Sequence, residues 1–185
     1  MNELKRQFTS IKVPSDQIID LEELNELKNN QNLLIDRAYD FIKDSDYEHA
    51  LELFCIGLQS DNSDPDLLNG LGITLCELNR MEEAKAILKR AVRLNSDDAI
   101  TIANLAGVCW ELEEYEEAIH HYAESLKQDP DLEDVYINLI NLYFECDSVF
   151  MAFITCTQLL DRFPDHEEAQ ELLDDIILNL GIMLL

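Results

Sequence analysis

Glycine and proline are scarce in this chain of 185 residues, with 5 and 4 copies, and long stretches of strictly alternating apolar and polar residues are absent. Both features disfavour a sheet-based fold joined by tight turns, so helices are expected to dominate. No run of eighteen apolar residues occurs, and no membrane-spanning helix is expected. The five cysteines form no C-x-x-C pair, which favours free thiols in a reducing compartment.

Basic residues are also few: 13 Lys and Arg stand against 39 Asp and Glu, for a net charge of -26. A protein that binds nucleic acid or anionic lipid must offer cations to displace counterions, so these partners are not expected. Basic or apolar partners fit better. The first residues, MNELKRQFTSIKV, lack the apolar core of a secretory signal. We therefore expect a soluble, cytoplasmic protein, and 47% hydrophobic residues are enough for a sizeable core.

What the chain does contain is an internal repeat. The stretch YEEAIHHYAESL at 115–126 aligns with YEHALELFCIGL at 47–58, MEEAKAILKRAV at 81–92 and VFMAFITCTQLL at 149–160. All four copies share an alanine in the fourth place, and these alanines are spaced by 34 residues: Ala50, Ala84, Ala118 and Ala152. Other columns recur at the same spacing. The second copy has Leu68, Leu71, Gly72 and Leu75, the third has Ile102, Leu105, Ala106 and Cys109, and the fourth has Tyr136, Leu139 and Tyr143. A proline recurs at Pro130 and Pro164.

This period and pattern resemble the tetratricopeptide repeat (TPR) family, whose units are helix-turn-helix pairs. The resemblance implies an all-α, right-handed superhelical solenoid with capping helices at both ends. Small residues at Ala38, Gly72 and Ala106 would let paired helices approach closely, and Asp64 before Pro65 predicts a helix start. The expected divisions are an N-terminal segment 1–30 with an amphipathic helix at 15–28, four units at 31–64, 65–98, 99–132 and 133–164, and a C-terminal capping helix at 165–185.

No pattern indicates catalysis, a cofactor or a metal. The NGLG at 69–72 lacks a preceding strand and a third glycine, and the repeat already explains Gly72. His120 and His121 are adjacent, so they project about 100° apart on a helix, whereas a helical zinc pair needs a spacing of three or four. A further acidic group is expected to be a solvated turn: Glu111, Glu113, Glu114, Glu116 and Glu117.

In the TPR family, the first helix of each pair lines a concave groove. The resemblance implies that this groove would be unusually apolar here. The predicted partner-binding residues are Ile35, Tyr39, Asn69, Ile73, Ala103, Asn104, Trp110, Ile137, Asn138, Asn141 and Phe144, accompanied by Ile42, Cys76 and Ile100. An acidic rim is predicted at Glu77, Glu111, Asp134 and Glu145. Asn104 and Asn138 could hold an extended backbone as two rungs of an asparagine ladder, because Asp36 and Gly70 occupy the earlier places. Alternatively, the apolar residues only touch the next repeat.

The sequence therefore predicts a non-catalytic protein-interaction adaptor whose client carries apolar anchors and basic flanks. A clamp for a client's terminal carboxylate is not expected, since the positions that would need cations hold Ile35, Tyr39, Gly70, Ile100 and Asn104. Two alternatives are a chaperone resembling the class II chaperones of type III secretion translocators and a self-assembling scaffold. The helix at 149–160 and the tail IILNLGIMLL are apolar enough to suggest a homodimer, unless the C-terminal helix covers the fourth unit. The basic stripe Lys85, Lys89 and Arg93 is expected to be solvated and convex, with a docking patch for an acidic partner as the alternative.

Overall fold

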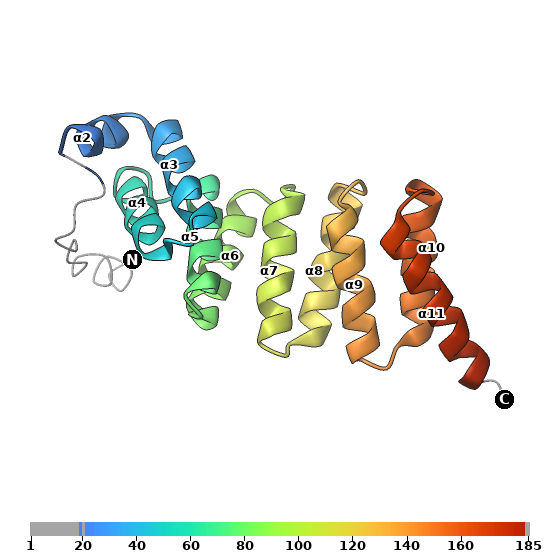
Figure 1. The fold of residues 1–185 in the computed structure, drawn as a ribbon. Coiled ribbons are helices and arrows are strands. Elements are labelled where there is room, and N and C mark those ends of the chain that lie inside the picture. The colour runs from blue at the N-terminus through green and yellow to red at the C-terminus, as the bar shows by residue number, and fades with distance from the viewer. Residues whose placement is uncertain (1–18, 20, 184–185) are drawn as a thin grey trace. The chain divides into compact units, whose positions relative to one another are not determined.

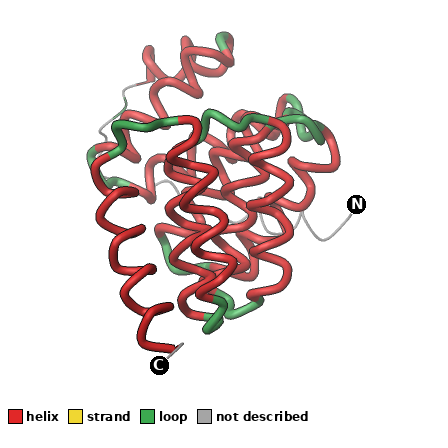
Figure 2. Tube along the Cα trace, turned by 90° about the vertical axis from the view of Figure 1, so that its right-hand side faces the viewer, coloured by secondary structure: helices red, strands yellow, loops and turns green. Residues whose placement is uncertain are grey.

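The computed structural model describes residues 19 and 21–183, and every regular element within them is a helix (Figures 1 and 2). The chain divides into two compact units, Met1–Ser96 and Asp97–Leu185. The first unit contains α2 (Leu21–Asn29), α3 (Gln31–Lys43), α4 (Tyr47–Ser60), α5 (Pro65–Glu77) and α6 (Met81–Leu94). The second contains α7 (Ala99–Glu111), α8 (Tyr115–Gln128), α9 (Glu133–Glu145), α10 (Val149–Arg162) and α11 (Glu167–Met183).

Helix starts repeat at the period of the sequence. The first helices of the pairs begin at 31, 65, 99 and 133, and their partners begin at 47, 81, 115 and 149, each series in steps of 34. The predicted start at Pro65 is confirmed, because the side chain of Asp64 accepts a hydrogen bond from the backbone N–H of Leu67 at 2.9 Å. Of the predicted N-terminal helix, residues 15–18 and 20 lie outside the described residues, and the described part of the helix runs from Leu21 to Asn29.

The columns of small residues lie where paired helices touch. The four repeated alanines and Ala38 and Ala106 all have 0% exposed surface. A Cβ added to Gly72 would lie 2.5 Å from Cγ of Leu88 on the partner helix. Each unit thus builds its own core, with large buried side chains such as Phe54 and Leu88 in the first and Ile102 and Ile140 in the second. Burial of these apolar faces is the main force holding each helix pair together.

Each helix pair is joined by a three-residue turn with one residue in the left-handed region. These residues are Ser45, Asn79, Glu113 and Asp147, with φ between 52° and 61°, and they too are 34 apart. In the third pair, the N–H of Glu113 donates to the carbonyl of Trp110 and the N–H of Glu114 donates to that of Cys109. This is the Schellman ending of a helix, and it directs the chain back along the helix it has just left.

Arg37 occupies a column that elsewhere holds leucine, and the structure gives the reason. Its guanidinium lies 3.1 Å from a carboxylate oxygen of Glu23 on α2 and 4.7 Å from the ring centre of Phe41. The helix that precedes the first pair in the chain, α2, is short and polar and is not part of a repeat unit. A long cationic side chain can cover an aromatic ring and still reach a carboxylate at the surface.

The last helix, α11, packs against α10, where the thiol of Cys156 donates to the carbonyl of Ala169 at 3.1 Å. The C-terminal helix α11 covers α10 only in part, so the predicted contact with a second subunit stays a prediction. Phe150 is 65% exposed and Met151 is 41% exposed, because α11 covers the face of Cys156 and leaves theirs open. In the described residues, no helix is both long and apolar enough to cross a membrane.

Candidate functional site

The predicted groove residues are distributed over both units, and each set is partly accessible. In the first unit, Ile35, Tyr39 and Ile73 are half-buried, and Glu77 of the rim is exposed. Asn69 differs from these, because only 9% of its surface is exposed and little of its side chain is available to a client. The ring of Tyr39 stands edge-on to that of the buried Phe54, with 5.6 Å between the ring centres, and this contact helps to hold the tyrosine ring in place.

In the second unit, the predicted residues lie on α7 and α9. Half-buried positions are Ala103, Asn104, Trp110, Ile137, Asn138 and Phe144, and exposed positions are Asn141 and the rim residues Glu111, Asp134 and Glu145. Ile100, in the first turn of α7, has 57% of its surface exposed. An apolar side chain left this open on a first helix is available to a partner.

The interruption of the asparagine column at Gly70 has a steric cause. A Cβ at this position would lie 2.2 Å from the ring of Phe54, which is fully buried. An asparagine could not fit without moving that ring. In the structure as in the sequence, the two asparagines of the column, Asn104 and Asn138, therefore both belong to the second unit.

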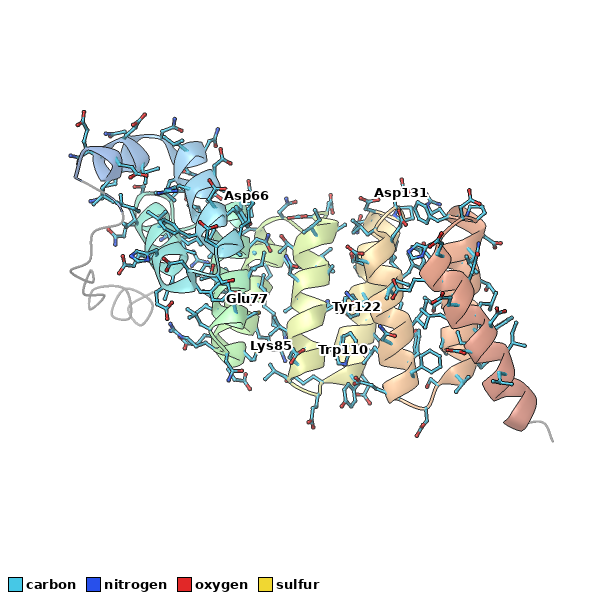
Figure 3. All side chains as sticks on the ribbon, in the orientation of Figure 1. Asp66, Glu77, Lys85, Trp110, Tyr122 and Asp131 are labelled. Atoms are coloured by element: carbon cyan, nitrogen blue, oxygen red, sulfur yellow. The ribbon has the colours of Figure 1, made fainter. Side chains whose placement is uncertain are left out.

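Trp110 connects two helix pairs of the second unit. Its indole N–H donates to a carboxylate oxygen of Glu145 on α9 at 2.8 Å. Its ring stands edge-on to that of Tyr122 on α8 at 6.4 Å, and Figure 3 labels both of these aromatic residues. The hydrogen bond holds the indole in one orientation while part of the ring remains accessible. The structure thus brings together one predicted anchor, Trp110, and one predicted rim residue, Glu145.

Carboxylates lie close to two titratable groups at this end of the second unit, Cys146 and Tyr122. Burial raises the pKa of the Cys146 thiol, and the nearby carboxylates of Glu116, Glu145 and Asp147 raise it further. Burial also raises the pKa of Tyr122 to about 12, with Glu111 contributing in the same direction. In both groups burial is the main cause, and the carboxylates add to the shift in the same direction.

Sequence reasoning missed a hollow of about 540 Å³ in the second unit. It lies between α8, α9 and α10, and its lining includes Leu126, Tyr136, Met151, Ile154 and Arg162. The repeat pattern assigns its residues to second helices and to packing, so no column distinguished it. The half-exposed Arg162 donates to Asp131 at its edge, which leaves a mixed polar and apolar rim.

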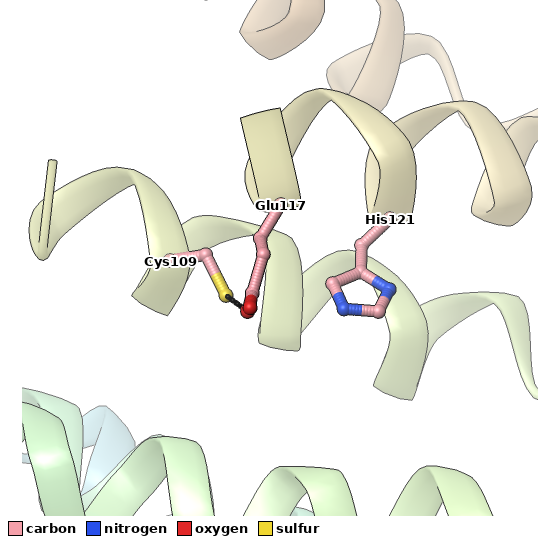
Figure 4. Close-up of side chains that lie close together, drawn as sticks. All are labelled: Cys109, Glu117 and His121. Atoms are coloured by element: carbon pink, nitrogen blue, oxygen red, sulfur yellow. Dashed lines mark hydrogen bonds between the residues drawn. The ribbon is translucent and has the colours of Figure 1, made fainter. Parts of the chain in front are cut away.

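A second cluster also went unrecognised. The donor atoms of Cys109, Glu117 and His121 all lie within 4.8 Å of one another (Figure 4). In the sequence, the adjacent pair His120 and His121 suggested a metal site, and adjacent residues do not share a helix face. The residue that shares the face of His121 is Glu117, four residues earlier. The third member comes from the preceding helix, where only the hairpin geometry places it.

Comparisons with known proteins agree with this architecture. Residues 65–131 match the family model of the tetratricopeptide repeat. Over 85 residues the chain is 27% identical to the TPR repeat-containing protein YsoA of Bacillus subtilis (strain 168). The matched stretch covers 45% of this chain and 25% of the length of that relative.

Solved structures show the same fold. The crystal structure of MamA superposes with a TM-score of 0.70 at 18% identity, covering 78% of this chain and 84% of that one. YrrB, described as a TPR protein with an unusual peptide-binding site, superposes with a TM-score of 0.65 at 23% identity, covering 82% and 85%. Both likenesses confirm the predicted all-α, TPR-type solenoid class.

Proposed function

Because this chain is a tetratricopeptide-repeat protein, we propose that it is a non-catalytic adaptor that binds a client protein segment on the first helices of its second unit. Stacked helix pairs of this family present surfaces suited to protein–protein interaction. The YrrB description extends that suitability to peptides. The client proposed here is an extended or helical segment with an apolar anchor flanked by Lys or Arg, met in the cytoplasm.

The observation that carries the proposal is the pairing of Trp110 with Glu145. A half-buried indole held by a hydrogen bond costs little conformational entropy when a partner docks on it. Tryptophan is also among the residues that most often dominate interface energies. The carboxylate beside it offers a site for a cation of the client, so the two groups match an apolar and a basic side chain in succession.

Exposed Ile100 and half-buried Phe144 extend the same apolar character along α7 and α9. Asn104 and Asn138, one repeat apart, offer amides that can both donate to and accept from a client backbone. Excess carboxylates should also speed association with a basic client, an advantage that salt would reduce.

Trp110 is the only tryptophan, so its fluorescence reports directly on this site. A client would first be isolated by affinity capture from the source cells, and its binding segment synthesised. We expect the segment to change the Trp110 emission, and Phe144→Ala to weaken binding by about 2 kcal/mol, roughly thirtyfold. Asn138→Ala should weaken binding less and without altering sequence preference.

Two controls make the experiment decisive. Met151→Glu alters the hollow between α8 and α10, and Lys89→Ala alters the basic stripe of α6; neither should change affinity by more than about twofold. Loss of binding in either control, with Phe144→Ala unaffected, would contradict the proposed surface. Circular dichroism of each variant separates lost binding from lost folding.

Self-association is a second candidate, favoured by the exposure of Phe150 and Met151 on α10 and of Ile177 and Leu178 on α11. Large exposed apolar side chains on one unit are typical of an association surface. Light scattering would test it: Phe150→Glu should convert a dimer to a monomer. A wild-type chain that remains monomeric at high concentration would exclude this role. Among the described residues, no specific contact favours the alternative of a secretion-type chaperone.

A further inference from the structure

We propose that Cys109, Glu117 and His121 form a binding site for one zinc ion. Glu117 and His121 are four residues apart on α8, so both side chains project from one face of that helix. Cys109 lies near the end of α7, the antiparallel partner of α8 (Figure 4). The turn between the two helices brings a thiol, a carboxylate and an imidazole to one place.

The distances suit a tetrahedral ion after small side-chain rotations. The Sγ of Cys109 already lies 3.7 Å from Oε2 of Glu117, and all three donor atoms fall within 4.8 Å of one another. Zinc bonds of about 2.3 Å to sulfur and 2.0–2.2 Å to nitrogen and oxygen place tetrahedral ligand atoms roughly 3.4–3.6 Å apart. The carboxylate and imidazole end flexible side chains, so they can move the remaining distance.

The internal repeat makes this set of residues stand out. The three places correspond to Phe41, His49 and Leu53 in the first copy, Leu75, Glu83 and Ile87 in the second, and Tyr143, Met151 and Thr155 in the fourth. Each other copy has at most one His, Cys, Asp or Glu among them. Only the third copy has such a residue at all three positions: Cys109 stands where the other copies have Phe, Leu and Tyr, and His121 stands where they have Leu, Ile and Thr.

The chemistry of the donors selects the ion. Thiolate and imidazole ligands favour zinc over magnesium or calcium, which prefer oxygen. The charges of a thiolate and a carboxylate balance a divalent ion, and binding would release the thiol proton to solvent. Cys109 is buried, His121 is half-buried and Glu117 is exposed, so the ion would enter from the side of α8. Three protein ligands leave the fourth position for water.

The test uses the full chain without a histidine tag, stripped of metal by a chelator and kept reduced. Equilibrium dialysis is expected to give one zinc per chain, and cobalt should give the absorption of a tetrahedral, thiolate-bound ion. Because loss of even an outer-shell partner typically weakens metal sites 10–100-fold, His121→Ala and Glu117→Gln should each weaken binding at least about tenfold. At the same zinc concentration, the Tm of the wild type should rise by more than that of these variants.

His120→Ala is the matched control, since His120 is adjacent, more exposed and on a different face of the helix. It should leave zinc affinity unchanged. Cys109→Ala should abolish the thiolate band of bound cobalt; if that variant unfolds, His121→Ala still decides the outcome. The proposal is overturned if the wild type binds no stoichiometric zinc, or if His120→Ala and His121→Ala weaken binding equally.

Discussion

At the scale of single residues, the left-handed turns are the most informative departures from ideal chemistry. Glycine favours this backbone region because it lacks a Cβ, and asparagine tolerates it better than other residues. This chain instead uses Ser45, Glu113 and Asp147, with asparagine only at Asn79. Aspartate shares this tolerance, so the turns at Ser45 and Glu113 are the two that are built at a cost in conformational energy.

We predict that Glu113→Gly stabilises the protein by about 1 kcal/mol. The substitution removes a steric penalty of about 1–2 kcal/mol from the folded state. Part of this gain is offset because glycine adds conformational entropy to the unfolded chain. Denaturation in urea would measure the change. Asn79→Gly is the control and should alter stability by less than half as much. Equal effects at both positions would show that left-handed strain is not the cause.

Helix starts supply a second residue-scale prediction. Three of the first helices begin after a capping side chain, namely Asn30, Asp64 and Asp98, each of which accepts a backbone N–H. The corresponding residue before α9 is Leu132, and in the described structure no side-chain hydrogen bond caps this helix.

Leu132→Asn should therefore stabilise α9 by about 1 kcal/mol, the usual value of such a cap. The measurement is again the midpoint and slope of urea unfolding. Leu132→Ala separates the cap from the loss of the leucine, since it removes the side chain without offering an acceptor. If both substitutions lower stability equally, the packing of Leu132 outweighs the cap.

At the scale of helices, Tyr122 links α8 to the pH dependence of folding. Its hydroxyl ordinarily titrates near pH 10, and burial with neighbouring Glu111 raises its pKa to about 12 in the folded chain. Between these values the unfolded chain holds fewer protons than the folded chain. Stability must therefore fall as the pH rises from about 10 to 12.

Tyr122→Phe keeps the ring and removes this titration. We expect the wild type to lose up to about 2–3 kcal/mol more than Tyr122→Phe between pH 9 and pH 12. Urea unfolding across that range measures both. Cys55, whose pKa is also raised to about 12 by burial, is present in both proteins, so its contribution cancels. Identical slopes would mean that Tyr122 titrates normally in the folded chain.

The sequence could predict those features of the helices that recur in every copy of the repeat, and not those that occur once. The spacing of Ala50, Ala84 and Ala118 predicted the helix pairs because every copy meets the same packing constraint. Arg37 and its contact with Glu23 could not be predicted, since α2 lies outside the repeat. The zinc cluster was missed for a related reason: Cys109 and His121 come from different helices, and each read alone as a packing residue.

For the whole molecule, charge is the dominant global property. The 39 Asp and Glu outnumber the 13 Lys and Arg by 26, so the chain carries a large excess of negative charge whatever the arrangement. Described ion pairs such as Arg80 with Glu83 and Arg162 with Asp131 are at the surface and contribute little each. Repulsion among the remaining carboxylates should therefore oppose folding into compact units.

We predict that the Tm rises with added sodium chloride until screening is complete, since the Debye length is only about 10 Å at 0.1 M salt. Each kcal/mol of relieved repulsion should raise the Tm by about 2–4 °C in a chain of this size. Calorimetry at low and moderate salt would measure the shift. Repeating the series near pH 4.5 is the control, because partial protonation of carboxylates should reduce the salt effect. A Tm that falls with salt at neutral pH would mean that ion pairs outweigh repulsion.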